Sequence, residues 1–140
     1  MKRKIWHYLA SLIMAVGVCA TAIFRTDVQA SESFREPQII RCTGYCDYGY
    51  TKSGQYVREG IVAGKKEWLG KTAYIWAVDE DGTIGEFLGI YEFLDTGYGI
   101  NGSLKNGTSI DIWHPSKDAV WEWIGEYGDY VWLQIVDAKG

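Results

Sequence analysis

Histidine and cysteine are scarce in this sequence of 140 residues, which contains two His and three Cys. One of each lies in the first 20 residues, which leaves His114, Cys42 and Cys46 in the rest of the chain. A structural zinc ion takes four Cys or His ligands at characteristic spacings, and these three residues do not provide them. We therefore expect no metal site and no other cofactor.

A largely apolar run occupies the N-terminus. The bases Lys2, Arg3 and Lys4 precede it, and Val28-Gln29-Ala30 places small residues where a signal peptidase cuts. We predict a signal peptide over residues 1–30 and a secreted or cell-wall associated protein. Because the run is about long enough to span a bilayer, an uncleaved anchor that holds the protein at the membrane is the alternative.

Basic residues are few in the remainder of the chain. Residues 31–140 contain 10 Lys and Arg against 17 Asp and Glu, a net charge of −7. An acidic surface argues against nucleic acid or an anionic membrane as partner. These 110 residues suffice for one domain with one core, so we predict a loose leader at 31–37, a domain at 38–140 and a monomer.

Short β segments separated by Gly, Asp-Gly and Asn-Gly follow residue 37. The predicted strands are Ile39–Tyr45, Tyr56–Ala63, Thr72–Val78, Phe87–Phe93, Ser109–Trp113 and Tyr130–Val136. One helix is indicated over 116–126, with Ser116 as N-cap and Gly128 beyond its end. The fold class is therefore mainly β, and six short strands favour a small closed barrel because closure removes exposed strand edges.

Cys42 and Cys46 stand four residues apart in a compartment that permits disulfides. Four residues of extended chain span about 13 Å, which is beyond the reach of a disulfide. The two pair only if the chain turns sharply at Thr43-Gly44, and we predict a Cys42–Cys46 bridge on that condition.

Several motifs occur in the order found in one known family. They are Thr43-Gly44-Tyr45-Cys46, residues 61–70 with Tyr74-Ile75 beyond, Asp95-Thr96-Gly97, Ile110-Asp111-Ile112-Trp113, and Tyr130-Val131-Trp132-Leu133. Together they resemble the 3D domains, a branch of the double-psi β-barrels named for three aspartates. The resemblance implies a six-stranded double-psi barrel. The first aspartate of the family falls at Ala63 or Gly64 here, so one of the three carboxylates is absent from its usual position.

The resemblance implies a lytic transglycosylase that cuts the glycan strand of peptidoglycan, with Asp111 as the general acid and Asp95 beside it. Strand alternation places Asp111 on the face opposite Ile110 and Ile112. Desolvation and a second carboxylate would both raise its pKa. We expect the two carboxylates to face one groove rimmed by the Gly/Asn-rich loop between them. Substrate-binding candidates are Gly97, Tyr98, Trp68 and Trp113.

Other interpretations remain open at this stage. An Asp in a strand is often a structural residue, and Asp95 before Thr-Gly fits a turn. The missing first aspartate and the many aromatic residues favour a non-catalytic module that binds peptidoglycan or a related polysaccharide. A glycoside hydrolase with two catalytic carboxylates is the third possibility.

Overall fold

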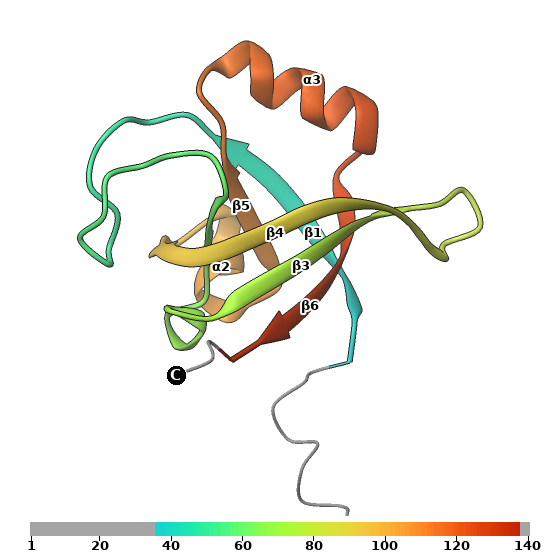
Figure 1. The fold of residues 1–140 in the computed structure, drawn as a ribbon, viewed down its shortest axis with the longest axis horizontal. Coiled ribbons are helices and arrows are strands. Elements are labelled where there is room, and N and C mark those ends of the chain that lie inside the picture. The colour runs from blue at the N-terminus through green and yellow to red at the C-terminus, as the bar shows by residue number, and fades with distance from the viewer. Residues whose placement is uncertain (1–35, 138–140) are drawn as a thin grey trace, which may run out of the picture. The chain divides into compact units, whose positions relative to one another are not determined.

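The computed structural model describes residues 36–137, so the predicted signal peptide and most of the leader lie outside the described residues. Six strands form a closed barrel in the order β1-β5-β2-β4-β3-β6 (Figure 1). The strands are β1 (Gln38–Tyr45), β2 (Ile61–Gly64), β3 (Thr72–Val78), β4 (Ile84–Thr96), β5 (Ser109–Trp113) and β6 (Tyr130–Val136). The predicted small, mainly-β, six-stranded barrel is confirmed.

The bounds of β3, β5 and β6 agree with the predicted strands, and β1 begins one residue earlier. The predicted strand Tyr56–Ala63 is wrong over its first half, because β2 begins only at Ile61. Tyr56 pairs with Tyr50 in an isolated bridge of the long 46–60 loop. Gly60 then adopts a positive φ of 85°, which interrupts any strand before β2.

Two strand pairs are parallel, β1 with β5 and β2 with β4, whereas the other four pairings are antiparallel. Parallel neighbours need crossover connections: residues 46–108 lead from β1 to β5, and residues 65–83 lead from β2 to β4. β2 lies between β4 and β5, so strands that are distant in sequence become lateral neighbours at one wall of the barrel.

The predicted helix is confirmed as α3 (Lys117–Tyr127). The Ser116 side chain accepts a hydrogen bond from the Ala119 amide, and Gly128 follows the last turn with a φ of 78°. The Gly/Asn-rich loop also folds locally, into the 3-10 helix η2 (Ile100–Gly102) and the short helix α2 (Ser103–Asn106), which were not predicted. Within residues 36–137, no helix is both long and apolar enough to cross a bilayer.

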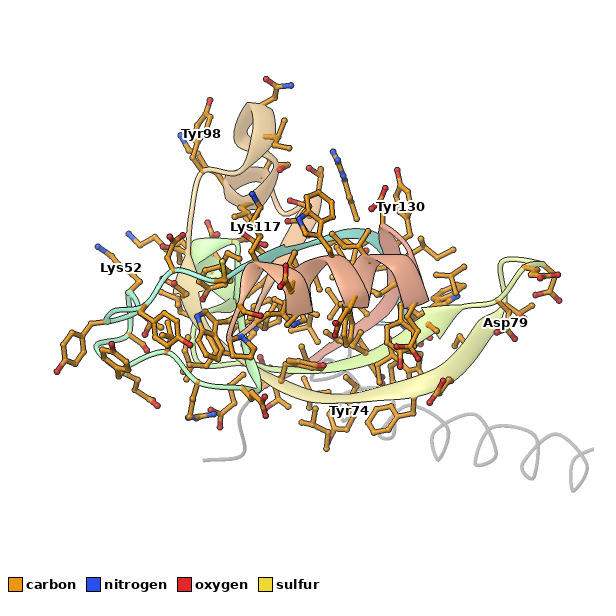
Figure 2. The ribbon with its side chains drawn as sticks, turned by 90° about the horizontal axis from the view of Figure 1, so that it is seen from above. Lys52, Tyr74, Asp79, Tyr98, Lys117 and Tyr130 are labelled. Carbon is orange, nitrogen blue, oxygen red and sulfur yellow. The ribbon has the colours of Figure 1, made fainter. Side chains whose placement is uncertain are left out.

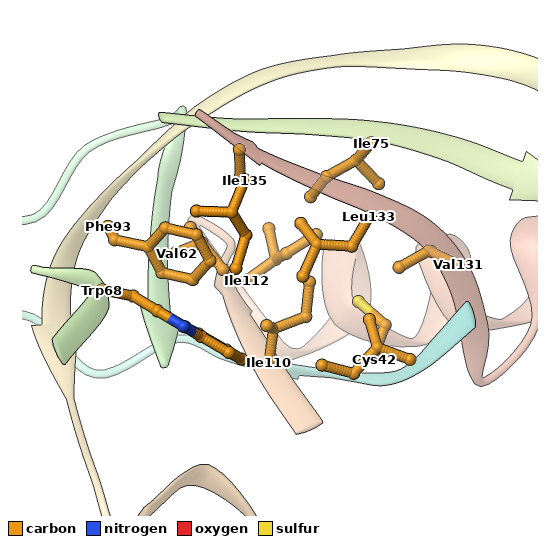
Figure 3. Close-up of a cluster of buried hydrophobic side chains, with 12 residues drawn as sticks. Cys42, Val62, Trp68, Ile75, Phe93, Ile110, Ile112, Val131, Leu133 and Ile135 are labelled. Carbon is orange, nitrogen blue, oxygen red and sulfur yellow. The ribbon is translucent and has the colours of Figure 1, made fainter. Parts of the chain in front are cut away.

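The barrel interior is filled by alternate residues of the strands (Figure 3). Its fully buried side chains include Val62, Ile75, Phe93, Ile110 and Leu133. A second apolar cluster lies under the 46–60 loop and contains Val57, Ile61, Leu94 and Trp113, with Tyr45 packed against it. This cluster attaches the loop to the barrel end at which β1 and β5 finish and β2 begins.

Candidate functional site

One lateral row of residues crosses β4, β2, β5 and β1. Asp95 pairs with Ala63, Ala63 with Asp111, and Asp111 with Thr43. Side chains at paired positions of neighbouring strands share one face of a sheet. Because Ile110 and Ile112 are buried in the core, Asp111 faces out of the barrel. The two aspartates therefore stand on the same outer face, one on each side of Ala63.

A β-bulge brings Asp95 into this row. Val62 pairs with Phe93, but the next residue of β2, Ala63, pairs with Asp95, so Leu94 is an extra residue in β4. Without the bulge, Leu94 would stand opposite Ala63, and Asp95 would lie one position further along. Bulges often redirect a side chain beside an active site, and this one places Asp95 level with Asp111.

Both carboxylates line one pocket of about 140 Å³. Thr96, Gly97 and Leu104, which belong to the segment between the two aspartates, also line it. Pockets of about 270 and 200 Å³ share lining residues with it on either side and lengthen it into a groove. In Figure 2, Tyr98 stands out from the rim segment, on the side of the molecule away from Tyr74.

The carboxyl group of Asp111 is set up to hold a proton near neutral pH. Burial raises its pKa to about 6, the Thr43 hydroxyl opposes this, and the negative charges of Asp47 and Asp95 add to the rise. The Thr43 hydroxyl donates to Asp111 Oδ1 at 3.0 Å. A carboxylic acid with this pKa can donate a proton to an oxygen leaving group in mildly acidic solution.

Asp95 has a different environment from Asp111. Its Oδ1 accepts hydrogen bonds from the backbone amides of Lys52 at 3.0 Å and Thr96 at 2.9 Å. The Tyr45 hydroxyl donates to its Oδ2 at 3.1 Å. Burial and Asp95 raise the pKa of Tyr45, so that the phenol remains a donor. These three donors hold the Asp95 carboxyl group in a fixed orientation beside Asp111.

Asp47 is a third carboxylate at the site, and the sequence analysis missed it. It is exposed, follows β1 by two residues, and lines the same pocket as Asp95 and Asp111. Its backbone carbonyl accepts a hydrogen bond of 3.0 Å from Trp113 Nε1. The only available signal was its position just past a strand end. Its proximity to Asp111 follows from the parallel pairing of β1 with β5, which the sequence does not reveal.

The predicted binding residues divide into two groups. Gly97 lines the carboxylate pocket, and Tyr98 on the rim segment is 67% exposed. Trp68 is 4% exposed and packs against Phe93 in the core, and Trp113 is 5% exposed beneath the 46–60 loop. Neither buried indole can form the wall of a groove, so assigning substrate binding to Trp68 and Trp113 is wrong. Trp113 instead supports the loop that carries Asp47.

The predicted disulfide between Cys42 and Cys46 is not formed. Both thiols are free, because β1 continues in extended form through Tyr45 and no sharp turn brings the sulfurs together. Cys42 is part of the barrel core, and burial raises its pKa to about 12. It therefore behaves as a small apolar side chain.

The carboxyl groups of this groove are not arranged as a metal site. In the part of the chain that the structure describes, no group of three or more His, Cys, Asp or Glu side chains is placed to hold a metal ion. No family model, no curated protein and no solved structure matches the chain.

Proposed function

We propose that this protein acts outside the cytoplasm on the glycan strands of peptidoglycan, or a related polysaccharide, and cleaves them in the manner of a lytic transglycosylase. The observation that carries the proposal is the protonatable carboxyl group of Asp111, whose pKa is about 6, in a groove that it shares with two other carboxylates. The resemblance to 3D domains in the sequence supports the same reaction.

The reaction assigns each carboxyl group a role. Asp111 donates its proton to the glycosidic oxygen as the bond to the anomeric carbon breaks. The 6-hydroxyl of the same sugar attacks that carbon and closes an anhydro ring, and its proton passes to the Asp111 carboxylate. Asp95, which accepts three hydrogen bonds, supplies negative charge near the positive charge that develops on the sugar.

A long substrate suits the shape of the site. The pocket with the three carboxylates adjoins one pocket through Leu104 and Asp111, and another through Tyr45, Asp47 and Asp95. A polymer that lies along this line would present one linkage to Asp111 and place sugars on both sides. Exposed Tyr98 at the rim offers an aromatic face for one of them.

A glycoside hydrolase is the second candidate, and the presence of a second carboxyl group, Asp95, in the pocket of Asp111 favours it. A carboxylate opposite a general acid can activate a water molecule, which would leave a reducing end in place of an anhydro ring. The two reactions use the same residues and differ only in the nucleophile.

Mass spectrometry of purified sacculi incubated with the protein tests this proposal. Anhydromuramic ends indicate the lytic reaction, and reducing ends indicate hydrolysis. Retained binding without products would identify a binding module and reject catalysis.

Asp111→Asn should reduce cleavage by about 10²- to 10⁴-fold, the usual contribution of a general acid, while binding to sacculi persists. The matched control is Asp79→Asn, the same chemical change at an exposed position of the β3–β4 turn, far from Tyr98 and Lys52 in Figure 2. Asp79→Asn should retain full activity. Full activity in Asp111→Asn would remove Asp111 from the mechanism.

A further inference from the structure

A pocket of about 270 Å³ adjoins the carboxylate groove on the side of β1 and the rim segment. Asp111 and Thr43 also line this pocket. A sugar substituent that occupies it would therefore belong to a sugar next to the bond that is cleaved. Its other lining residues are Arg41, Gly99, Ile100, Ser103, Leu104 and Ser109.

Arg41 gives this pocket a positive charge. It lies two residues before Thr43 in β1 and pairs with Ser109, as Thr43 pairs with Asp111, so both side chains project from the outer face. Among residues 36–137, the ion pairs join Arg58 to Glu92 and Lys71 to Asp137, and none involves Arg41. The guanidinium therefore has its donors available to a ligand, at the edge of a groove with three aspartates.

The remaining walls supply neutral hydrogen-bonding groups and close backbone contact. Ser109 Oγ donates to Ser103 Oγ at 2.8 Å, which leaves the Ser103 hydroxyl proton free to turn toward the pocket. Gly99 has a φ of 71°, and a Cβ there would stand 2.6 Å from Ser103 Oγ. Only glycine fits at this position, and it keeps the pocket wall open.

A neutral sugar would gain little from an unpaired guanidinium, whereas a carboxylate can accept two parallel hydrogen bonds from it. We propose that this pocket binds a carboxylate-bearing substituent of the sugar beside the cleaved bond, and that Arg41 selects for it. The inference rests on the proposed function and narrows its substrate class to glycans with acidic sugars. A muramic acid whose lactyl carboxyl group carries no stem peptide and a uronic acid both provide such a carboxylate.

Binding of single sugars to the full chain tests the pocket without requiring cleavage. N-acetylmuramic acid, glucuronic acid and N-acetylglucosamine are titrated separately, and NMR shifts report each dissociation constant. At least one acidic sugar should bind about tenfold or more tightly than N-acetylglucosamine, since hydrogen bonds to charged groups are the stronger ones. Preference for N-acetylmuramic acid alone assigns the lactyl group, and preference for both assigns a general carboxylate site.

The variants isolate the charge of Arg41. Arg41→Gln should abolish the preference, and Arg41→Lys should retain part of it because the charge remains without the planar donor pair. Lys105→Gln removes an exposed cation of α2 that does not line the pocket, and should leave the preference unchanged. Equal binding of all three sugars to the unmodified protein, or an undiminished preference in Arg41→Gln, overturns the proposal.

This outcome can be separated from that of the proposed function. Selective binding of an acidic sugar by a protein that cuts no sacculi supports the pocket and rejects the lytic reaction. Cleavage of sacculi by a protein without any preference for acidic sugars supports the reaction and overturns the pocket.

Discussion

The carboxyl group of Asp111 has neighbours that act on its proton in opposite directions. The Thr43 hydroxyl donates to it and favours the anion, whereas Asp47 and Asp95 bring negative charge that favours the acid. Burial is the largest effect and holds the pKa at about 6. A general acid must be protonated, so the proposed activity should be present below pH 6 and fall as the pH rises through that value.

Asp47→Asn and Thr43→Val should move this pH limit in opposite directions. Asp47→Asn removes a negative charge that raises the pKa of Asp111, so the alkaline limb of the activity profile should shift to lower pH. Thr43→Val removes a hydrogen bond to the carboxylate, so the limb should shift to higher pH. Profiles of initial cleavage rate against pH measure both shifts. Shifts of the same sign in the two variants would contradict this account of Asp111.

The two thiols should differ in reactivity. Cys42 is buried with a pKa of about 12, whereas Cys46 is half-buried just beyond the end of β1. Since the thiolate is the reactive form, iodoacetamide should label Cys46 in the native protein and reach Cys42 only after unfolding. Peptide mass spectrometry locates the label. Protection of both thiols, reversed by a reductant, would show that a disulfide forms after all.

At the scale of helices and strands, the contact between β1 and α3 depends on a glycine of β1. A Cβ at Gly44 would lie 2.8 Å from Val120 Cγ1 and 3.1 Å from His114 Cδ2. Gly44 therefore sets how closely the helix approaches the strand that carries Thr43 and Tyr45. Nothing within 4 Å would meet a Cβ at Gly125, on the exposed side of the same helix.

Gly44→Ala should destabilise the protein by about 1–3 kcal/mol, the usual cost of overpacking. Gly125→Ala should stabilise it by roughly 0.5–1 kcal/mol, because alanine is the better helix former. In the double variant Gly44→Ala/Val120→Ala, the free energy of unfolding should fall by less than the sum of the decreases in the two single variants. The reason is that the new methyl group at position 44 displaces the Val120 side chain, which the double variant lacks. Urea unfolding of the four variants and the unmodified protein measures these differences. If the decreases in the free energy of unfolding simply add, the contact with Val120 does not limit how closely α3 approaches β1.

Local signals in the sequence predicted the elements well, whereas the site depended on pairings that no local signal reveals. Ser116 and Gly128 mark the ends of α3, and the turn at Gly82 marks the β3–β4 hairpin, because caps and turns are short-range features. The joint position of Asp95 and Asp111 was expected from the family motifs. The bulge at Leu94 and the parallel approach of β1 to β5, which adds Asp47, are long-range features.

The burial of aromatic residues was also beyond what local signals in the sequence could predict. Trp68 and Trp113 were expected at the groove because an aromatic residue suits both a core and a sugar-binding surface. Their burial is decided by tertiary neighbours: Gly64 and Gly107 leave room for Trp68, and the 46–60 loop covers Trp113. Composition alone could not separate the two roles.

Barrel closure gathers the three carboxylates at the scale of the whole molecule. Asp47, Asp95 and Asp111 come from the ends of β1 and β4 and from β5, and they share a pocket only in the folded protein. Folding therefore changes the proton affinity of Asp111, and the free energy of unfolding must depend on pH.

The sign follows from the direction of the shift. The pKa of Asp111 rises from 3.8 to about 6 on folding, so its stabilising contribution is complete below about pH 4 and is lost as the pH rises through 6. The loss corresponds to roughly 3 kcal/mol above that pH. Asp111→Asn cannot ionise, so its free energy of unfolding relative to the unmodified protein should increase between pH 4 and pH 7. Asp79→Asn serves as control and should show no such increase. Urea unfolding across this pH range measures the difference in the free energy of unfolding between Asp111→Asn and the unmodified protein. A difference that does not change with pH would mean that Asp111 titrates alike in the folded and unfolded chains. The groove would then lack its proton donor.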